Sequence, residues 1–174
     1  MSALVRALVP TLIVVLLSAL SGCACAREVT IDRMAPPEPG EQADERVAEP
    51  AQGESVVVLD TGNTLGIRPG GTAPSFTLDR PAKLESITTY HYIDGGGPAP
   101  GTIGLTADDG TAYGPWQAYG LEGQGGVANA FWRVDADVPL PVGTYTIVDS
   151  DPSTWSTNDT AEGVGFATVM VVYE

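Results

Sequence analysis

The sequence predicts an all-β protein, an antiparallel β-sandwich of about eight strands, with a jelly roll as one topology that fits. Three observations favour this class. After Glu54 the chain consists of short runs rich in Val, Ile, Thr, Tyr and Phe, each closed by Gly, Pro, Asn or Asp. Many of the 21 glycines and 14 prolines fall between these runs, which predicts frequent turns. No later stretch shows the apolar periodicity of a helix of adequate length.

The individual strands follow from these runs. The clearest is 130–138, in which Trp132 and Val134 alternate with Arg133 and Asp135, the pattern of a strand with one buried face. We expect strands over 55–60, 74–78, 84–93, 102–107, 116–121, 130–138, 144–149 and 164–173.

Two further patterns bear on how the strands are arranged. The runs 56–59 and 169–172 are apolar on both faces, so we expect both to occupy covered, central positions. Asp109-Gly110 predicts a tight turn with a strand on either side.

Residues 1–22 predict a signal peptide for export. Arg6 precedes an uncharged apolar run that ends in small residues, which is the order of a secretory signal. The segment Leu20-Ser21-Gly22-Cys23 resembles the lipobox of bacterial lipoproteins, in which the lipidated cysteine becomes the first mature residue. The resemblance implies an extracytoplasmic protein held on a bacterial membrane by a lipid on Cys23.

Two alternatives stay open for this segment. Residues 7–26 carry no charge, so they could form an uncleaved membrane-spanning helix, which needs roughly 20 apolar residues. Pro10 and Gly22 weaken such a helix. A signal peptidase could instead cut near Ala24-Cys25-Ala26 and release a secreted protein.

Residues 23–53 predict a disordered linker that precedes a domain over 54–174. The linker has several prolines and carboxylates but no aromatic residue, so it cannot bury enough apolar surface to offset the entropy lost on ordering. The two cysteines, Cys23 and Cys25, both precede the domain. The domain is therefore expected to rely on its apolar core without a disulfide.

The charge balance excludes one class of partner. The chain carries 22 acidic and 8 basic residues and a net charge of −14. Binding to nucleic-acid phosphates requires clustered Lys and Arg, so no nucleic-acid partner is expected. Most of the carboxylates are expected to be solvated surface.

The sequence favours a protein that is not an enzyme. The domain has one histidine, His91, and lacks the G-x-S-x-G, H-E-x-x-H and P-loop patterns. We expect His91, within Thr88-Thr89-Tyr90-His91-Tyr92, to be a structural residue that is packed or half exposed between aromatic residues. A small carboxylate-dependent hydrolase stays open, because its two acids need not be close in sequence.

One acidic segment has the composition of a calcium-binding loop. Asp149 and Asp151 end a predicted strand on the same side, and Asn158 and Asp159 follow. Because Ca²⁺ binds about six to eight oxygen ligands, these four residues form a candidate metal site with Ca²⁺ as the candidate cofactor. The alternative is a surface loop in which Asp149 caps a turn.

Three aromatic residues beside polar groups predict a ligand site. Trp116 and Tyr119 lie in a glycine-containing segment, and Trp155 lies among Ser and Thr, so we expect Trp155 to be partly exposed. Sugar rings stack on such flat faces in carbohydrate-binding sandwiches. The alternative is that tryptophan packs into the core, as the alternation predicts for Trp132.

Several segments resemble a module of uncharacterised exported bacterial proteins, namely 88–92, 101–105, 114–116 and 145–156. The resemblance covers most of 54–174 and implies a fold and an exported location rather than an activity. Together these patterns favour a cell-surface lipoprotein whose sandwich binds a glycan or a partner protein. The alternatives are a purely structural envelope-associated sandwich without a small ligand and a small carboxylate-dependent hydrolase.

Overall fold

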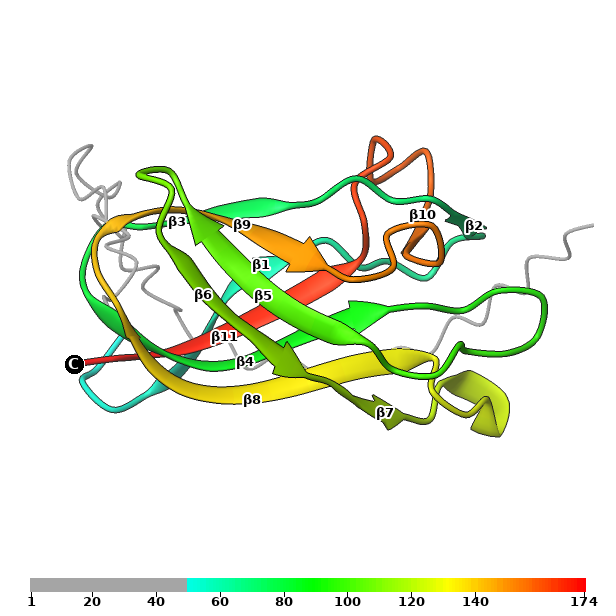
Figure 1. The fold of residues 1–174 in the computed structure, drawn as a ribbon, viewed down its shortest axis with the longest axis horizontal. Helices are drawn as coiled ribbons and strands as arrows, with labels where there is room; N and C mark the ends of the chain where they lie inside the picture. The colour runs from blue at the N-terminus through cyan, green and yellow to red at the C-terminus, as the bar shows by residue number, and fades with distance from the viewer. Residues whose placement is uncertain (1–49) are drawn as a thin grey trace, which may run out of the picture. The chain divides into compact units, whose positions relative to one another are not determined.

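The structure is a computed structural model that describes residues 50–174. It confirms the predicted all-β fold, with two antiparallel sheets that form a sandwich (Figure 1). One sheet has the strand order β1-β11-β4-β8-β7 and the other β3-β9-β5-β6, while β2 and β10 form a separate pair. The strands are β1 (Ser55–Asp60), β2 (Arg68–Pro69), β3 (Ser75–Leu78), β4 (Ala82–Tyr90), β5 (Thr102–Ala107), β6 (Ala112–Gln117), β7 (Tyr119–Leu121), β8 (Phe131–Leu140), β9 (Gly143–Asp149), β10 (Ser156–Thr157) and β11 (Ala167–Tyr173).

The strand pairing has the connectivity of a jelly roll. When the three short strands β2, β7 and β10 are set aside, the remaining strands pair in a nested order. The first pairs with the last, β1 with β11, and β3 then pairs with β9, β4 with β8, and β5 with β6. This nesting places sequence-distant strands side by side, so loops at one end of the sandwich come from different parts of the chain.

One predicted strand, 116–121, proves to be two strands in different sheets. The turn at Asp109, whose carboxylate accepts a hydrogen bond from the Thr111 N–H at 2.8 Å, starts β6 earlier than expected. The chain changes sheet between β6 and β7 at Ala118, which is buried and donates its N–H to the Gly101 carbonyl at 2.9 Å. Extended backbone continues on both sides of this point, so periodicity alone does not reveal the crossing.

The core lies between the two sheets and follows the predicted alternation. Trp132, Val134 and Ala136 of β8 are buried, whereas Asp135 and Asp137 are exposed. The other sheet contributes inward-facing apolar side chains from β3, β5 and β9. Among residues 50–174, every buried side-chain nitrogen or oxygen has a hydrogen-bond partner, as expected for a native core.

The expectation that the runs 56–59 and 169–172 are both central holds only for the second. β11 lies between β1 and β4, and its residues alternate between buried and partly buried. β1 lies at the edge of the five-stranded sheet, where Val57 is 51% exposed. Val56 and Val58 still pack against the core. An apolar edge strand can therefore have the composition of a central one.

The two ends of the sandwich are formed by different parts of the chain. At one end the chain enters the domain, where the Gly53 N–H donates to the Tyr173 carbonyl at 3.0 Å and Arg80 donates to the Pro50 carbonyl at 3.1 Å. Residues 50–53 of the predicted linker thus contact the domain. The opposite end carries the β2–β10 pair (Figure 1).

Several predictions concern residues that the structure does not describe. The signal peptide 1–22, the lipidation residue Cys23 and the linker as far as residue 49 all lie outside the described range. Within residues 50–174, no helix is long and apolar enough to cross a membrane. The helical content of this range is one short 3-10 turn, η1 (Gln124–Gly126), between β7 and β8.

Alkaline pH is expected to destabilise the domain through Tyr145, which is buried and donates its hydroxyl to the Pro141 carbonyl at 2.7 Å. Burial raises the pKa of Tyr145 from 10.0 to about 12. The folded state therefore favours the neutral phenol, so its contribution is complete below pH 10.0 and is lost as the pH rises to about 12. Urea unfolding of Tyr145→Phe should show a weaker loss of stability over this window. Equal losses in the variant and the wild type would contradict the assignment.

Candidate functional site

A row of apolar side chains crosses the outer face of the five-stranded sheet near one end of the sandwich. Leu121 of β7 is paired with Phe131 of β8, and Phe131 is paired with Tyr90 of β4. The Tyr90 N–H donates to the carbonyl of Phe166, the residue before β11, at 3.1 Å. Directly opposed residues project from the same face of a sheet. Strand register thus gathers residues that are far apart in the sequence.

Four rings define what we term the aromatic cleft: Tyr90, Tyr92, Phe131 and Phe166. The centre of the Tyr90 ring lies 4.6 Å from that of Phe131, 6.3 Å from that of Tyr92 and 6.4 Å from that of Phe166. The Tyr90 plane makes angles of 6° with Tyr92, 18° with Phe166 and 40° with Phe131. Three of the four rings are therefore nearly parallel, with Tyr90 at the centre of the cluster.

The cleft has a volume of about 560 Å³. One wall is the loop 62–67, which follows β1. A reciprocal amide pair holds this loop, since Asn63 donates to Asn158 Oδ1 at 3.2 Å and Asn158 donates to Asn63 Oδ1 at 2.6 Å. The lining consists of Gly62, Asn63, Thr64, Leu65, Gly66, Ile67, Thr88, Tyr90, Tyr92, Gln124, Phe131, Phe166, Ala167 and Thr168.

The polar groups of the cleft are hydroxyls and amides. Thr88 and Thr168 form a directly opposed pair beside the aromatic row. The hydrogen bonds that Tyr90 and Tyr92 make within residues 50–174 come from their backbone groups, and their phenol hydroxyls make none there. Burial raises the pKa of the Tyr90 phenol above its usual value, and Tyr92 adds to the rise. Tyr90 is therefore a neutral hydrogen-bonding group at physiological pH.

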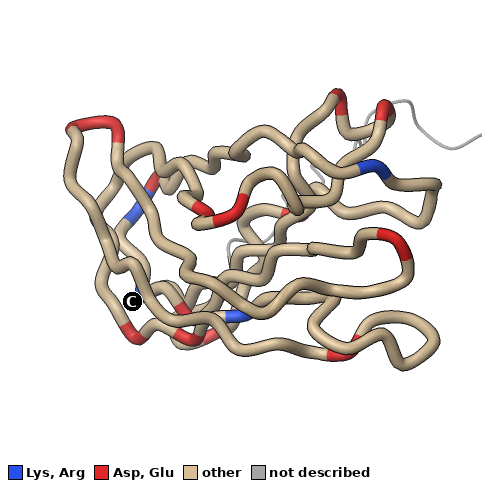
Figure 2. The backbone as a smooth tube through the Cα atoms, turned by 45° about the vertical axis from the view of Figure 1, so that its right-hand side comes forward, with Lys and Arg blue, Asp and Glu red and all other residues tan. Residues whose placement is uncertain are grey.

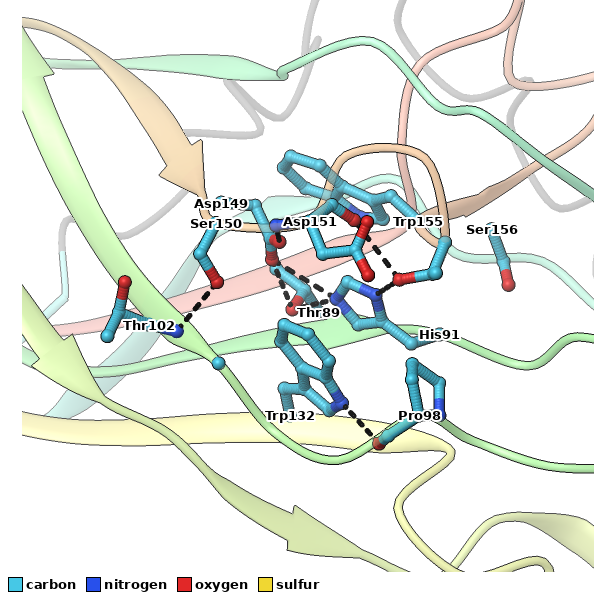
Figure 3. Close-up of polar contacts among 12 residues, drawn as sticks. Thr89, His91, Pro98, Thr102, Trp132, Asp149, Ser150, Asp151, Trp155 and Ser156 are labelled. Atoms are coloured by element: carbon cyan, nitrogen blue, oxygen red, sulfur yellow. Dashed lines mark hydrogen bonds and ion pairs between the residues drawn. The ribbon is translucent and has the colours of Figure 1, made fainter.

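His91 lies between Tyr90 and Tyr92 in the sequence, but its side chain points into the core. It is fully buried, and its ring stacks on Trp132 with the ring centres 3.8 Å apart, while Trp155 lies 6.4 Å away (Figure 3). Of the two placements expected for His91, packed or half exposed between aromatic residues, the structure shows the packed one. The rings that contact it are two tryptophans distant in sequence.

Both ring nitrogens of His91 have polar partners. Nε2 lies 3.1 Å from Asp149 Oδ2 and 2.9 Å from Thr89 Oγ1, and Nδ1 lies 2.8 Å from Thr154 Oγ1. The side chains of His91 and Asp149 have no exposed surface, and Thr89 also donates its hydroxyl to Asp149 Oδ2 at 3.2 Å. Buried polar groups of this kind are tolerated only when they are paired. This buried array, formed by Thr89, His91, Asp149 and Thr154, therefore joins the loop after β9 to the end of β4.

The same loop also holds the cleft residue Tyr92. Ser156 is fully buried, and its hydroxyl accepts the Tyr92 N–H at 3.0 Å and donates to the Tyr92 carbonyl at 3.1 Å. Asp149 and Thr154 contact His91, so three side chains of the segment 149–156 fix the backbone that carries the cleft tyrosines. The cleft thus rests on a buried set of polar contacts.

The prediction that Trp155 is partly exposed is wrong. Its side chain is 1% exposed, and its Nε1–H donates to the Phe166 carbonyl at 2.9 Å. The neighbours Ser156 and Thr157 are also buried, and their hydroxyls donate to backbone carbonyls. Polar neighbours therefore give no indication of exposure where each hydroxyl has an internal partner.

The other two predicted ligand residues do not meet Trp155 at a common surface. Trp116 of β6 is partly buried and packs against the core. Tyr119 of β7 is 43% exposed and is paired with Arg133, two pairs along from the apolar row and on the same face. Its hydroxyl donates to Asp135 at 2.6 Å. Tyr119 thus lies near the cleft on the same sheet but is not among the residues that line it.

The four candidate metal ligands have separate partners. Asp149 Oδ2 contacts the buried imidazole, and its Oδ1 accepts the Asp151 N–H at 2.8 Å. Asn158 belongs to the amide pair that holds the cleft loop, and Asp159 forms an ion pair with Arg68 at 3.2 Å. Among residues 50–174, no group of three or more His, Cys, Asp or Glu side chains could hold a metal ion. Both carboxylate oxygens of Asp149 accept hydrogen bonds from described residues.

Sequence reasoning missed the aromatic cleft, although one signal pointed to it. In a strand, Tyr90 and Tyr92 project from the face opposite to His91, so an inward histidine predicts two outward tyrosines. Phe131 and Phe166 gave no comparable signal, because only the strand register brings them to Tyr90.

No protein-family model, curated protein or solved structure matches the chain. The aromatic faces, hydroxyls and amides of the cleft suit a ligand that has both apolar faces and hydrogen-bonding groups.

Proposed function

We propose that this protein is a cell-surface lipoprotein, anchored through Cys23, whose β-sandwich is a non-enzymatic module that binds a glycan in the aromatic cleft. The observation that carries the proposal is the cluster of four rings around Tyr90, bordered by hydroxyl and amide groups. A pyranose ring has apolar C–H faces and a hydroxyl rim, so it can stack on aromatic rings and bond to the groups around them.

The composition of the lining favours binding over catalysis. Glycoside hydrolysis generally uses two carboxylates on either side of the scissile bond. None of the described residues that line the cleft is Asp, Glu or His. His91 and Asp149 lie beneath it and are fully buried, so they are not placed to meet a ligand in the cleft. Their contacts support a role in holding the fold.

Loss of the central ring should remove most of the glycan affinity. A glycan array screened with the wild type identifies the ligand, and calorimetry then compares it with Tyr90→Ala. Burying a large apolar side chain contributes about 1.5–3 kcal/mol, so Kd is expected to rise by about 10- to 100-fold. Tyr119→Ala, on the same sheet but outside the cleft, is the control and should bind within about twofold of the wild type. Near-UV circular dichroism checks that both variants fold.

An array with no bound glycan would reject the proposed function. Equal losses in the two tyrosine variants would place the binding surface elsewhere on the sheet. Retained affinity in a folded Tyr90→Ala variant would likewise reject the cleft as the site.

The anchor is tested separately at Cys23. Replacing Cys23 by Ala removes the thiol that would carry the lipid, so the protein should move from the detergent phase to the aqueous phase in a partition experiment. Cys25→Ala is the matched control and should stay in the detergent phase. Retention of Cys23→Ala in that phase would favour a membrane-spanning N-terminal segment.

A further inference from the structure

We propose that the aromatic cleft is selective for a neutral glycan and rejects the same glycan when it carries a carboxylate, sulfate or amine. This inference rests on the proposed function and narrows its ligand class. It is carried by the distribution of charge around the cleft and by the mutual orientation of the rings.

The lining of the cleft differs in character from the rest of the chain. The chain has 22 acidic and 8 basic residues and a net charge of −14. Among the described residues that line the cleft there is no Asp, Glu, Lys, Arg or His. The acidic residues are spread over several loops and strands of the domain (Figure 2). The strand register places Asp60 beside the cleft, opposite Thr168, but Asp60 is not part of the lining. An uncharged ligand therefore enters without removing a charged side chain from water.

Among residues 50–174, no basic side chain lines the cleft to pair with an anionic glycan. Residues 50–174 contain four basic side chains, Arg68, Arg80, Lys83 and Arg133, besides His91. Three of them form ion pairs: Arg68 with Asp159 at 3.2 Å, Lys83 with Asp137 at 2.7 Å, and Arg133 with Asp135 at 2.9 Å. The fourth, Arg80, lies 3.8 Å from the centre of the Tyr173 ring.

Arg133 is the basic residue that the strand register places beside the cleft. It lies opposite Thr88, two pairs along from the apolar row. Its Nε donates to Asp135, which also accepts the Tyr119 hydroxyl. This neighbouring carboxylate offsets the charge of Arg133, so the surroundings of the cleft offer no net attraction for an anion.

A cationic ligand is also poorly matched. A buried ammonium needs a carboxylate or several ring faces directed at one point. The described lining supplies no carboxylate. The planes of Tyr92 and Phe166 lie within 6° and 18° of that of Tyr90. Nearly parallel rings form a layered surface and do not enclose a point charge, so they suit the faces of a neutral sugar ring better.

The test uses the exported full-length protein and matched glycans. Neutral oligosaccharides are compared with the same backbones after oxidation to uronates, after sulfation and after replacement of a hydroxyl by an amine. The neutral form is expected to bind at least about tenfold more tightly than each charged form, because a buried unpaired charge is unfavourable. The Kd of the neutral form should also change by less than about twofold between about 0.01 and 1 M NaCl, over which the Debye length falls from about 30 to about 3 Å.

A variant with a basic residue in the cleft tests the same inference by creating affinity for an anionic glycan. Asp60 lies opposite residue 168, so the variant also carries Asp60→Asn, which removes that carboxylate. In this background Thr168→Lys places a cation beside the cleft rings, and it should bind the uronate form up to about fivefold more tightly than Asp60→Asn alone at low salt, which is the effect of a partly exposed ion pair. Thr168→Gln, which is similar in length but uncharged, is the control and should not gain this affinity.

The outcomes separate the two proposals. If no glycan of any charge binds, the proposed function fails. If a glycan binds in a Tyr90-dependent manner but a charged form binds as tightly as the neutral one, or the neutral form shows a strong salt dependence, the proposed function stands and the inferred selectivity is overturned.

Discussion

Replacing Asp149 by Ala is expected to lower the free energy of unfolding by at least about 1–3 kcal/mol, the cost of leaving a buried hydrogen-bonding group without its partner. The Asp149 side chain has no exposed surface. It accepts hydrogen bonds from Thr89 and from the Asp151 N–H, and it lies 3.1 Å from Nε2 of His91. Alanine would leave these groups in the core without their partner. Urea unfolding followed by tryptophan fluorescence measures the loss.

Two further variants make this prediction specific. Asp149→Asn keeps the shape and one acceptor oxygen, so its loss should be clearly smaller. Asp151→Ala is the matched control two residues along the chain, because the described contact of its carboxylate is with Ser153 on an exposed part of the loop. It should change stability by no more than about 0.5 kcal/mol. An equal loss in the Asp151 and Asp149 alanine variants would contradict the role assigned to the buried array.

Replacing Trp155 by Ala should also destabilise the fold by about 3–5 kcal/mol, the usual range for deleting a buried tryptophan. The ring is 1% exposed and donates to the Phe166 carbonyl at 2.9 Å. The backbone at Gly165 packs closely against it, since a Cβ there would lie 2.5 Å from the ring. Little room is therefore available for the chain to collapse into the cavity. A urea titration gives the size of the loss.

The Trp155 experiment separates a core residue from a ligand residue. Gly165→Ala should destabilise the domain too, because its added methyl group would meet the Trp155 ring. Tyr119→Ala, at a side chain that is 43% exposed, serves as the surface control and should have a much smaller effect. A stable Trp155→Ala variant that has lost only its ligand affinity would support the earlier interpretation of Trp155 as a binding residue.

The strands could be predicted from the sequence because the alternation of apolar and polar residues is a local pattern. The alternation of Trp132 and Val134 with polar residues identified β8 and its buried face, and both side chains are buried. Periodicity says nothing about which sheet a strand joins. It therefore did not show that the chain changes sheet at Ala118 or that β1 lies at an edge. These features depend on pairing between distant segments.

The site was less predictable for two physical reasons. Exposure was inferred from neighbouring residues, and this failed at Trp155 because the hydroxyl of Ser156 is buried and bound to backbone groups. The cleft, in turn, is created by register: Phe131 stands opposite Tyr90, and Phe166 is bound to Tyr90 through the backbone. A single sequence gives the strands but not their partners.

The antiparallel pairing of β1 with β11 shows which end of the domain the chain enters and which end holds the cleft. Ser55 lies opposite Val172 where the chain enters, and Asp60 lies opposite Thr168 beside the cleft. Strands of this length span about 20 Å, so the point of attachment and the cleft occupy opposite poles of the sandwich. For a protein held at Cys23, as we propose, the linker would enter the domain at the end opposite to the cleft, so its point of entry leaves the cleft uncovered.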